Sequence, residues 1–166
     1  PEKICEKVCN FFENQNRFAG KKILITGGST YEAIDPVRFI GNHSSGKQAI
    51  EIAKVLSEMQ ADVTLVAGNI KETIPLPKEK IIAVKTAAEM FDAVKNNLSG
   101  NQVFIGCAAV SDFRVKNVSS EKIKKSNQNL TIELEKNPDI LEFVGHASNR
   151  PNLVIGFAAE SQNLEK

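Results

Sequence analysis

The chain has 166 residues, of which 42% are hydrophobic and 25% are charged, and its formal net charge is +1. These values are ordinary for a globular protein of one domain or slightly more, and the small net charge gives no reason to expect nucleic acid as a partner. No apolar run approaches the roughly 18 residues of a membrane span and no signal peptide is visible, so we expect no membrane partner. Three cysteines without the spacing of a disulfide framework favour a reduced, cytoplasmic location.

The first residues predict a short segment ahead of the main domain. Residues 3–15 have the spacing of an amphipathic helix, and the residues after it are polar. We therefore expect residues 1–18 to be a junction helix and linker, and residues 19–166 to form the main domain. Cys5 and Cys9 lie four residues apart on this helix, and because no other metal ligand lies nearby we expect them to pack rather than to bind a metal.

Apolar runs alternate with amphipathic stretches along the rest of the chain. The first run, residues 22–26, stops at two glycines and predicts a buried strand. Further strands are expected at residues 62–66, 81–84, 103–107, 130–135 and 153–157. Helices are expected at residues 46–59, from Thr86 onward with a capping box to Glu89, and from Pro138 to about residue 147. This alternation predicts an α/β fold, a Rossmann-like three-layer sandwich with a mostly parallel sheet.

The loop at residues 28–46 follows the first strand and is the most informative stretch of the chain. It is far longer than the roughly two to six residues of a typical connection from strand to helix. Right-handed crossovers place the loops after parallel strands along one edge of the sheet, where ligands bind in such folds. We therefore expect the loop to meet residues 107–112 and 157–160 in one ligand-binding crevice.

The simplest ligand for such an edge is a dinucleotide, and two observations argue against it. The dinucleotide motif needs a third glycine for close helix packing, but Glu32 occupies that position. The second strand should end near an acid for the ribose hydroxyls, yet it runs into Gly68 and Asn69. An NAD(P)-dependent oxidoreductase therefore stays only as an alternative.

A second nucleotide motif, the P-loop, matches in part. Residues 41–47 fit the pattern G-x-x-x-x-G-K, but Gln48 stands where a serine or threonine would hold Mg²⁺, and no strand directly precedes the motif. The physical principle partly survives, because Ser44, Ser45 and Gly46 at a helix N-terminus would expose backbone N–H groups to an anion. A simple helix cap by one of the serines is the alternative.

A basic loop covers residues 113–126 and holds a single acid, Glu121. Its cations are Arg114, Lys116, Lys122, Lys124 and Lys125. Such a charge run is usually a solvated surface. This one leaves the carboxyl end of a strand at the expected crevice, beside Asp112, where its lysines would close over phosphates and stabilise the charge of a transition state.

Several motifs, in order, resemble the phosphopantothenoylcysteine synthetase domain of the bacterial bifunctional phosphopantothenoylcysteine decarboxylase/phosphopantothenate–cysteine ligases. The resemblance covers about residues 20–162. Its blocks are ITGGST (residues 25–30), DPVRFIGNHSSGK (35–47), GCAAVSDF (106–113), EKIKK (121–125), KNPDIL (136–141) and GFAAE (156–160).

The resemblance implies an enzyme of coenzyme A biosynthesis. Its substrates would be 4′-phosphopantothenate, cysteine and CTP with Mg²⁺, and it would form an acyl-cytidylate with release of pyrophosphate and then CMP. It also implies a cytoplasmic homodimer and fusion to a decarboxylase half, in which alone FMN would be bound. Because the family continues beyond the last block with lysines that reach CTP, we expect this chain to be a C-terminally truncated piece that binds nucleotide weakly or does not turn over.

The resemblance also implies roles for individual residues. Asn42 would act in converting the acyl-cytidylate to product, and Lys122 would assist formation of the cytidylate and contact the nucleotide. By its charge, Arg38 would bind the phosphate or carboxylate of the substrate, and Ser44, Ser45 and Gly46 would bind the substrate through the helix N-terminus. The remaining nucleotide contacts would be Gly106, Cys107, Ala108, Asp112, Pro138, Asp139, Ile140, Leu141 and Phe157, and no residue is assigned to a metal. A non-catalytic dimeric module stays an alternative, and the sequence leaves open how strictly CTP is preferred over ATP.

Overall fold

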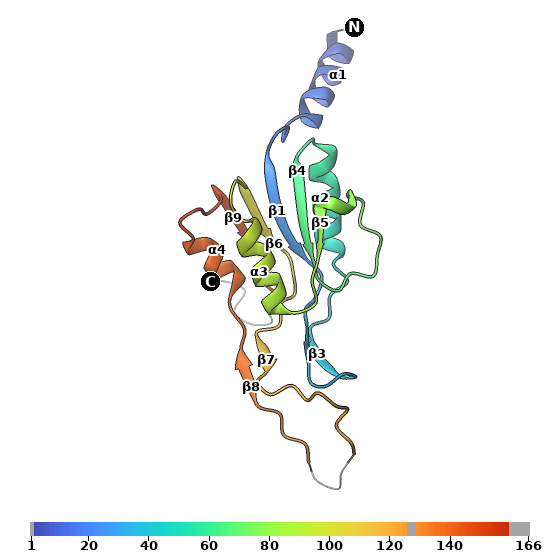
Figure 1. Ribbon diagram of the computed structural model, residues 1–166. Helices are drawn as coiled ribbons and strands as arrows, with labels where there is room; N and C mark the ends of the chain where they lie inside the picture. The colour runs from blue at the N-terminus through green and yellow to red at the C-terminus, as the bar shows by residue number, and fades with distance from the viewer. Residues whose placement is uncertain (1, 126–128, 160–166) are drawn as a thin grey trace.

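The computed structural model describes residues 2–125 and 129–159, and its centre is a five-stranded parallel sheet (Figure 1). The strand order is β5-β4-β1-β6-β9, so the first strand of the chain lies in the middle. The strands are β1 (Lys22–Gly27), β4 (Asp62–Ala67), β5 (Ile81–Ala83), β6 (Val103–Gly106) and β9 (Leu153–Gly156). The predicted Rossmann-like sandwich is confirmed, because the parallel strands and the helices on both faces are present.

Helices cover both faces of the sheet. The apolar residues of α2 (Lys47–Glu58) pack on one face, against Ile23 and Ile25. Leu24 points to the other face, where it meets the core residues of α3 (Ala87–Asn97) and α4 (Ile140–His146). Because successive side chains of a strand point to opposite faces, the run from Ile23 to Ile25 supplies both cores. A 3₁₀ turn, η1 (Lys78–Lys80), precedes β5.

Gly27 lets α2 approach the central strand closely. A Cβ atom built on Gly27 would collide with the Cβ atom of Ala49 on α2. Any larger residue would push the helix off the sheet, which is costly in a packed core. The end of β1 therefore needs glycine for packing, independently of any ligand.

Two antiparallel hairpins lie beyond the carboxyl edge of the sheet (Figure 1). Most of their short strands were not predicted from the sequence. One joins β2 (Tyr31–Ala33) and β3 (Phe39–Gly41) inside the expected loop at residues 28–46. The other joins β7 (Phe113–Val115) and β8 (Leu134–Lys136), where we expected a loop and a strand over residues 130–135. Strands of three residues are too short for alternation to reveal, which explains the difference.

The expected capping box of α3 is present, and a residue distant in sequence also caps this helix. Thr86 Oγ1 accepts the Glu89 N–H at 3.1 Å, and Glu89 reaches back to the Lys85 N–H at 2.6 Å. The buried side chain of Glu32 accepts the Ala87 N–H at 2.9 Å from 55 residues away. The position where a dinucleotide site has glycine therefore holds a helix cap.

The start of α4 corrects one expectation. We expected Pro138 at the first position of this helix, but the N-cap is Asp139, whose Oδ1 accepts the Glu142 N–H at 2.9 Å. A carboxylate already bonded to a helix N-terminus repels a further anion there. This end of α4 is consequently suited to a neutral group of a ligand rather than to a phosphate.

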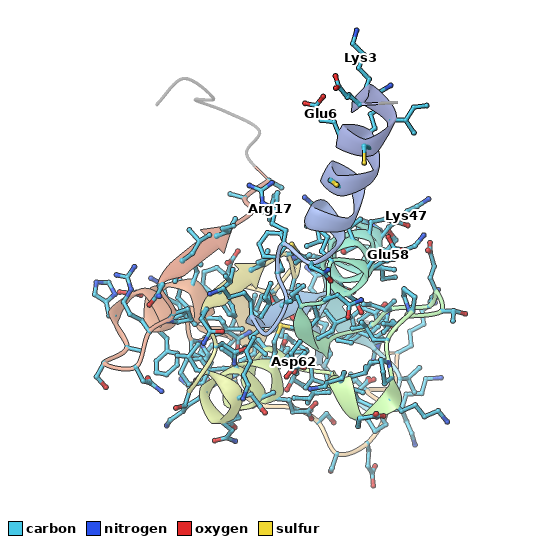
Figure 2. All side chains as sticks on the ribbon, turned by 90° about the horizontal axis from the view of Figure 1, so that it is seen from above. Lys3, Glu6, Arg17, Lys47, Glu58 and Asp62 are labelled. Atoms are coloured by element: carbon cyan, nitrogen blue, oxygen red, sulfur yellow. The ribbon has the colours of Figure 1, made fainter. Side chains whose placement is uncertain are left out.

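The first helix, α1 (Glu2–Gln15), projects away from the rest of the molecule, and Figure 2 shows Lys3 and Glu6 pointing into solvent. Cys5 and Cys9 are exposed, so our expectation that they pack was wrong, because the described residues leave both side chains uncovered. Across the described residues, no helix is long and apolar enough to cross a membrane.

Candidate functional site

The carboxyl ends of the central strands are tied together by backbone hydrogen bonds between their loops. The Cys107 N–H donates to Thr26 O at 3.0 Å and the Ala109 N–H donates to Gly28 O at 2.8 Å. On the other side the Asn69 N–H donates to Ser29 O at 2.8 Å. The expected meeting of the loops after β1 and β6 is confirmed.

A cavity of about 510 Å³ opens at this edge, within the range of roughly 300–1,000 Å³ that is common for small-molecule sites. Its walls come from four segments: the end of β1, β6 with the loop that follows it, the stretch from the end of β8 into α4, and Phe157 after β9. It is lined by Thr26, Phe104, Gly106, Ala108, Val110, Ser111, Asp112, Phe113, Lys136, Asn137, Pro138, Asp139, Ile140, Leu141, Glu142 and Phe157.

The nucleotide contacts that the sequence suggested fall almost entirely on this wall. All of them except Cys107 and Lys122 line the cavity. Lys122 lies in a separate groove, and Glu160, which we expected at the crevice, lies outside the described residues. The structure thus brings Gly106, Asp112 and Phe157 together although more than forty residues separate the last two.

Cys107 is absent from the cavity wall because the chain alternates at this point. Gly106 and Ala108 line the cavity, whereas the Cys107 side chain packs against the core on the α2 face. Desolvation by its surroundings raises the pKa of the Cys107 thiol to about 11. Since the thiolate is the reactive form, this cysteine is unsuited to act as a nucleophile.

We predict that Cys107 reacts far more slowly with a thiol reagent than Cys5 or Cys9. At pH 7.5 its raised pKa reduces the thiolate fraction roughly a hundredfold below that of an ordinary cysteine. Timed alkylation followed by peptide mass spectrometry measures the three rates separately. Denatured protein is the control, because all three thiols should then react alike. Equal rates in the folded protein would contradict the predicted protection of Cys107.

The charge of the cavity is mainly negative. Asp112, Asp139 and Glu142 line it, and Lys136 is the cation among its lining residues. Carboxylates accept hydrogen bonds from hydroxyl and amino groups but repel phosphates. The cavity therefore suits the base and ribose of a nucleotide better than its phosphates.

Asn137 is a structural residue of the site to which we had assigned no role. Its side-chain Nδ2 donates to Ser111 O at 2.8 Å, and its backbone N–H donates to Asp112 O at 2.8 Å. These two bonds fix the loop after β6 against the segment that leads into α4. An asparagine directly before Pro138 was visible in the sequence, but its partners are 26 and 25 residues away and no local pattern indicates them.

Asn42 comes from the other side of the cavity, just after β3. Its Nδ2 donates to Val110 O at 3.0 Å, and Val110 lines the cavity. A side-chain amide has two N–H bonds, so one more donor and the Oδ1 acceptor stay available to a ligand. The loop at residues 28–46 thus delivers a polar group to the rim of the site.

The backbone directly before α2 is left-handed at one residue, Gly46. Gly46 is the N-cap, with φ 75°, and makes no side-chain cap. A Cβ atom at this position would lie 2.6 Å from Ile70 Cγ1, so both the backbone angle and the packing require glycine. Ser44 and Ser45 make only long bonds, of 3.3 and 3.4 Å, to the Gly46 and Lys47 N–H groups.

A separate basic groove of about 730 Å³ lies beside the β7–β8 hairpin. Arg38 on one side faces the described part of the basic loop on the other. The groove is lined by Arg38, Lys122, Ile123, Lys124, Lys125, Asn129 and Leu130. This concentration of cations is the arrangement that attracts phosphates.

Arg38 is bound within the protein as well as facing the groove. Its Nε donates to Asp35 Oδ2 at 3.0 Å, its Nη2 also pairs with that oxygen, and Nη2 donates to Ile123 O at 3.0 Å. These bonds hold the pKa of the Asp35 carboxyl well below its usual range. Arg38 therefore has a structural partner, and its predicted contact with the substrate stays a prediction.

Comparison with known proteins assigns the chain to a family. The model of the DNA/pantothenate metabolism flavoprotein C-terminal domain matches residues 18–166. The coenzyme A biosynthesis bifunctional protein CoaBC of Haemophilus influenzae is 45% identical over 165 residues, which are 99% of this chain and 41% of that protein. CoaBC of Escherichia coli is 42% identical over 169 residues, which are 100% of this chain and 41% of that protein.

A solved structure agrees with these sequence matches. The crystal structure of the C-terminal domain of CoaBC superimposes with a TM-score of 0.76 and 41% identity, over 90% of this chain and 70% of that chain. The chain spans about two fifths of the length of the curated relatives that it matches. Because the family model covers almost the whole sequence, the chain belongs to the family of the DNA/pantothenate metabolism flavoprotein C-terminal domain.

Proposed function

We propose that this chain supplies the phosphopantothenate–cysteine ligase activity of a coenzyme A biosynthesis enzyme. The observation that carries the proposal is the convergence of the suggested nucleotide contacts on one cavity at the carboxyl edge of the sheet. The similarity to CoaBC proteins named for coenzyme A biosynthesis supports it. A site at this edge is also where open α/β sheets bind ligands.

The reaction that we propose has two steps. The carboxylate oxygen of 4′-phosphopantothenate attacks the α-phosphorus of CTP, which forms an acyl-cytidylate and expels pyrophosphate. The amine of cysteine then attacks the acyl carbon, which forms the amide and releases CMP. The first step is needed because a free carboxylate has no good leaving group.

We propose that the cavity and the basic groove bind different parts of the nucleotide. The base and ribose fit the acidic cavity, where Asp112 and Asp139 accept hydrogen bonds from hydroxyl or amino groups. The triphosphate extends toward the basic groove, where Lys122 stabilises the charge that develops as pyrophosphate leaves. The β7–β8 hairpin connects the two, because Phe113 and Lys136 line the cavity and Lys122 lies on the chain between them.

The acid substrate lies on the side of the loop at residues 28–46. The segment of Ser44, Ser45 and Gly46 would place an anion at the start of α2, whose dipole adds to the attraction, and the bond from the Gly46 N–H to Ser44 Oγ is long, at 3.3 Å. Asn42 offers its second amide N–H to the acyl carbonyl, and Arg38 offers the remaining donors of its guanidinium to a phosphate or carboxylate.

We assign Mg²⁺ to the bound nucleotide rather than to a preformed protein site. In the described part of the chain no three His, Cys, Asp or Glu side chains are arranged to hold a metal ion. Nucleotide-bound Mg²⁺ is commonly held by the phosphates and water with only one or two protein carboxylates, so we assign no residue of this chain to it.

The wider assembly is also part of the proposal. Residues 1–18 would join a flavin-dependent decarboxylase, in which FMN belongs, to the domain at residues 19–166, in agreement with the bifunctional naming of the relatives. A homodimer in the cytoplasm would use the hairpins outside the sheet, where Val118, Leu130 and Leu134 are about half exposed. Sedimentation equilibrium measures this association directly.

Calorimetric titration with CTP, ATP and NADPH in the presence of Mg²⁺ tests the proposal. We expect saturable binding of CTP, because the cavity and the groove are both present in this chain. Glu133→Gln is the control variant, since Glu133 pairs with the exposed Lys116 and lines neither the cavity nor the groove, so the change should leave binding unchanged. Binding of NADPH without CTP would overturn the ligase in favour of an oxidoreductase, and binding of no nucleotide by the complete protein would favour the non-catalytic module.

We predict that Asn42→Asp separates the two steps. The carboxylate keeps the size of the amide but cannot donate a hydrogen bond to Val110 O or to an acyl carbonyl. Release of pyrophosphate should continue, while transfer to cysteine falls by about a hundredfold and acyl-cytidylate accumulates. Asn97→Asp is the matched control, because the exposed Asn97 also donates to a backbone carbonyl, Ala93 O, but on α3. Equal loss of both steps in Asn42→Asp would contradict the assignment.

The oxidoreductase alternative gains no support from the positions on which it depends. The buried Glu32 carboxylate caps α3 and therefore belongs to the framework of the fold. Asn69 stands near the place of the missing acid, and its Nδ2 donates to the hydroxyl of Tyr31. Both residues serve the packing of the loop against the sheet.

A further inference from the structure

The turn between β2 and β3 contains a buried carboxylate. The side chain of Asp35 is 0% exposed, which is unusual for an aspartate. Its Oδ1 accepts the backbone N–H groups of Val37 at 2.9 Å and Arg38 at 2.8 Å. Those two bonds close the local turn, and one oxygen atom is sufficient for them.

The second oxygen of Asp35 reaches outside the turn. Oδ2 accepts the Ile123 N–H at 3.1 Å and pairs with the Arg38 guanidinium. Arg38 Nη2 in turn donates to Ile123 O at 3.0 Å. Both the N–H and the C=O of Ile123 are thus hydrogen-bonded to the pair of Asp35 and Arg38, which lie 88 and 85 residues earlier in the chain.

The turn by itself does not need a carboxylate at Asp35. A buried carboxylate is costly unless it is paired, and an uncharged acceptor such as asparagine would close the same turn. Only an ionised Oδ2 can accept from Arg38 and from Ile123 together. The hydrogen bonds that lower the pKa of Asp35 keep it in that ionised state.

The gripped residue lies directly between Lys122 and Lys124, in the basic groove. Its neighbours in the described part of the loop are exposed and carry few other anchors. Ser119 provides one, because its N–H donates to Ile34 O at 3.0 Å in the same turn. The position of the Lys122 backbone therefore depends mainly on residues 34–38.

We propose that Asp35 is a positioning residue, which acts through Arg38 and Ile123 to hold Lys122 at the place where the reaction needs its charge. The contacts between Asp35 and the loop do not depend on which reaction the protein catalyses, whereas their effect on catalysis rests on the proposed function. A displacement of about 1 Å at a reacting group is sufficient to lower a rate roughly a hundredfold. The hydrogen bonds to Ile123 fix the backbone beside Lys122 and so limit such a displacement.

Asp35→Asn in the complete protein tests the anchor. Asparagine keeps Oδ1 for the turn but turns an N–H₂ group toward two donors, so the grip on Ile123 is lost. Limited digestion with trypsin, with the cuts mapped by mass spectrometry, should show cleavage after Lys122 and Lys124 accelerated by about tenfold to a hundredfold. Glu133→Gln is the control, because it removes an exposed ion pair of the same hairpin and should leave the cleavage rate unchanged.

A second variant removes the contact from the side of the loop. Ile123→Pro deletes the gripped N–H while Asp35 and Arg38 stay unchanged, so it should accelerate cleavage after Lys124 even if Asp35→Asn does not fold. Wild-type cleavage rates in both variants, with unchanged circular dichroism, would overturn the anchor whatever reaction the protein catalyses.

A double variant tests the effect on catalysis. Asp35→Asn alone should lower kcat for CTP-dependent pyrophosphate release at least about tenfold and change the KM for CTP less than about threefold. In the Lys122→Gln background, Asp35→Asn should cause no further loss, because the group that it positions is already absent. Additive losses would overturn the positioning role. A wild-type protein that releases no pyrophosphate would overturn the proposed function, and the digestion would still decide the anchor.

Discussion

Lys122→Gln is expected to lower the rate of CTP-dependent pyrophosphate release by about a hundredfold to a thousandfold. Glutamine keeps much of the length of lysine but has no charge, so it cannot neutralise the phosphate that leaves. Removal of one well-placed electrostatic group from an active site typically costs about this factor. Lys122 lies in the basic groove rather than in the cavity, so the base and ribose contacts should survive.

Two measurements make this expectation specific. Pyrophosphate release, followed with a coupled assay, should fall, while the affinity for CTP measured by calorimetry should weaken much less. Lys124→Gln is the matched control, because it removes the same charge from the same loop two residues away. If the Lys124 variant lost as much activity as the Lys122 variant, the total charge of the loop would be responsible and Lys122 would have no special role.

Phe104→Ala is expected to lower the free energy of unfolding by about 3–5 kcal/mol. Phe104 is 0% exposed on β6, pairs with Leu24 of β1 in the sheet register, and belongs to the core under α3 and α4. Its truncation removes a large buried ring and leaves a cavity that the surrounding helices cannot fill. Because domains of this kind are stable by only about 5–15 kcal/mol in total, the loss is severe.

Denaturant unfolding followed by circular dichroism measures this change. Phe113→Ala is the matched control, because Phe113 is 45% exposed on the hairpin and its truncation should cost roughly 1 kcal/mol or less. A similar cost for both variants would mean that the core under α3 and α4 is not the main source of stability. The Phe104 ring also lines the cavity, so Phe104→Leu, which keeps most of the volume, should retain nucleotide binding.

The division of the site into an acidic cavity and a basic groove has a physical consequence. A triphosphate carries several negative charges, which three carboxylates would repel, whereas a base and a ribose carry none. For the function that we propose, the nucleotide therefore has one favourable orientation across the hairpin, with its phosphates toward Lys122 and Arg38. High salt should weaken the phosphate contacts more than the contacts in the enclosed cavity.

The position of the site was predictable because parallel strands align their carboxyl ends. Apolar runs at residues 22–26 and 103–107 were sufficient to locate two central strands, and their loops then had to meet. The same alternation would have excluded Cys107 from the cavity, since Gly106 and Ala108 flank it on the opposite face. The Cys107 side chain packs against the core, and the contact with the nucleotide that the resemblance implies for it stays a prediction.

The sequence by itself determined the layered fold, the edge that carries the site and most of the cavity wall. The fold and the edge follow from local periods and from the geometry of parallel crossovers, which act over short stretches of chain, whereas the residues of the cavity wall follow from the family resemblance. Only the tertiary structure decided that Glu32 caps α3, that Asn137 holds the loop after β6 and that Asp35 grips Ile123. Each of these hydrogen bonds joins residues 26 to 88 positions apart, and no local pattern encodes the partner of a buried polar group.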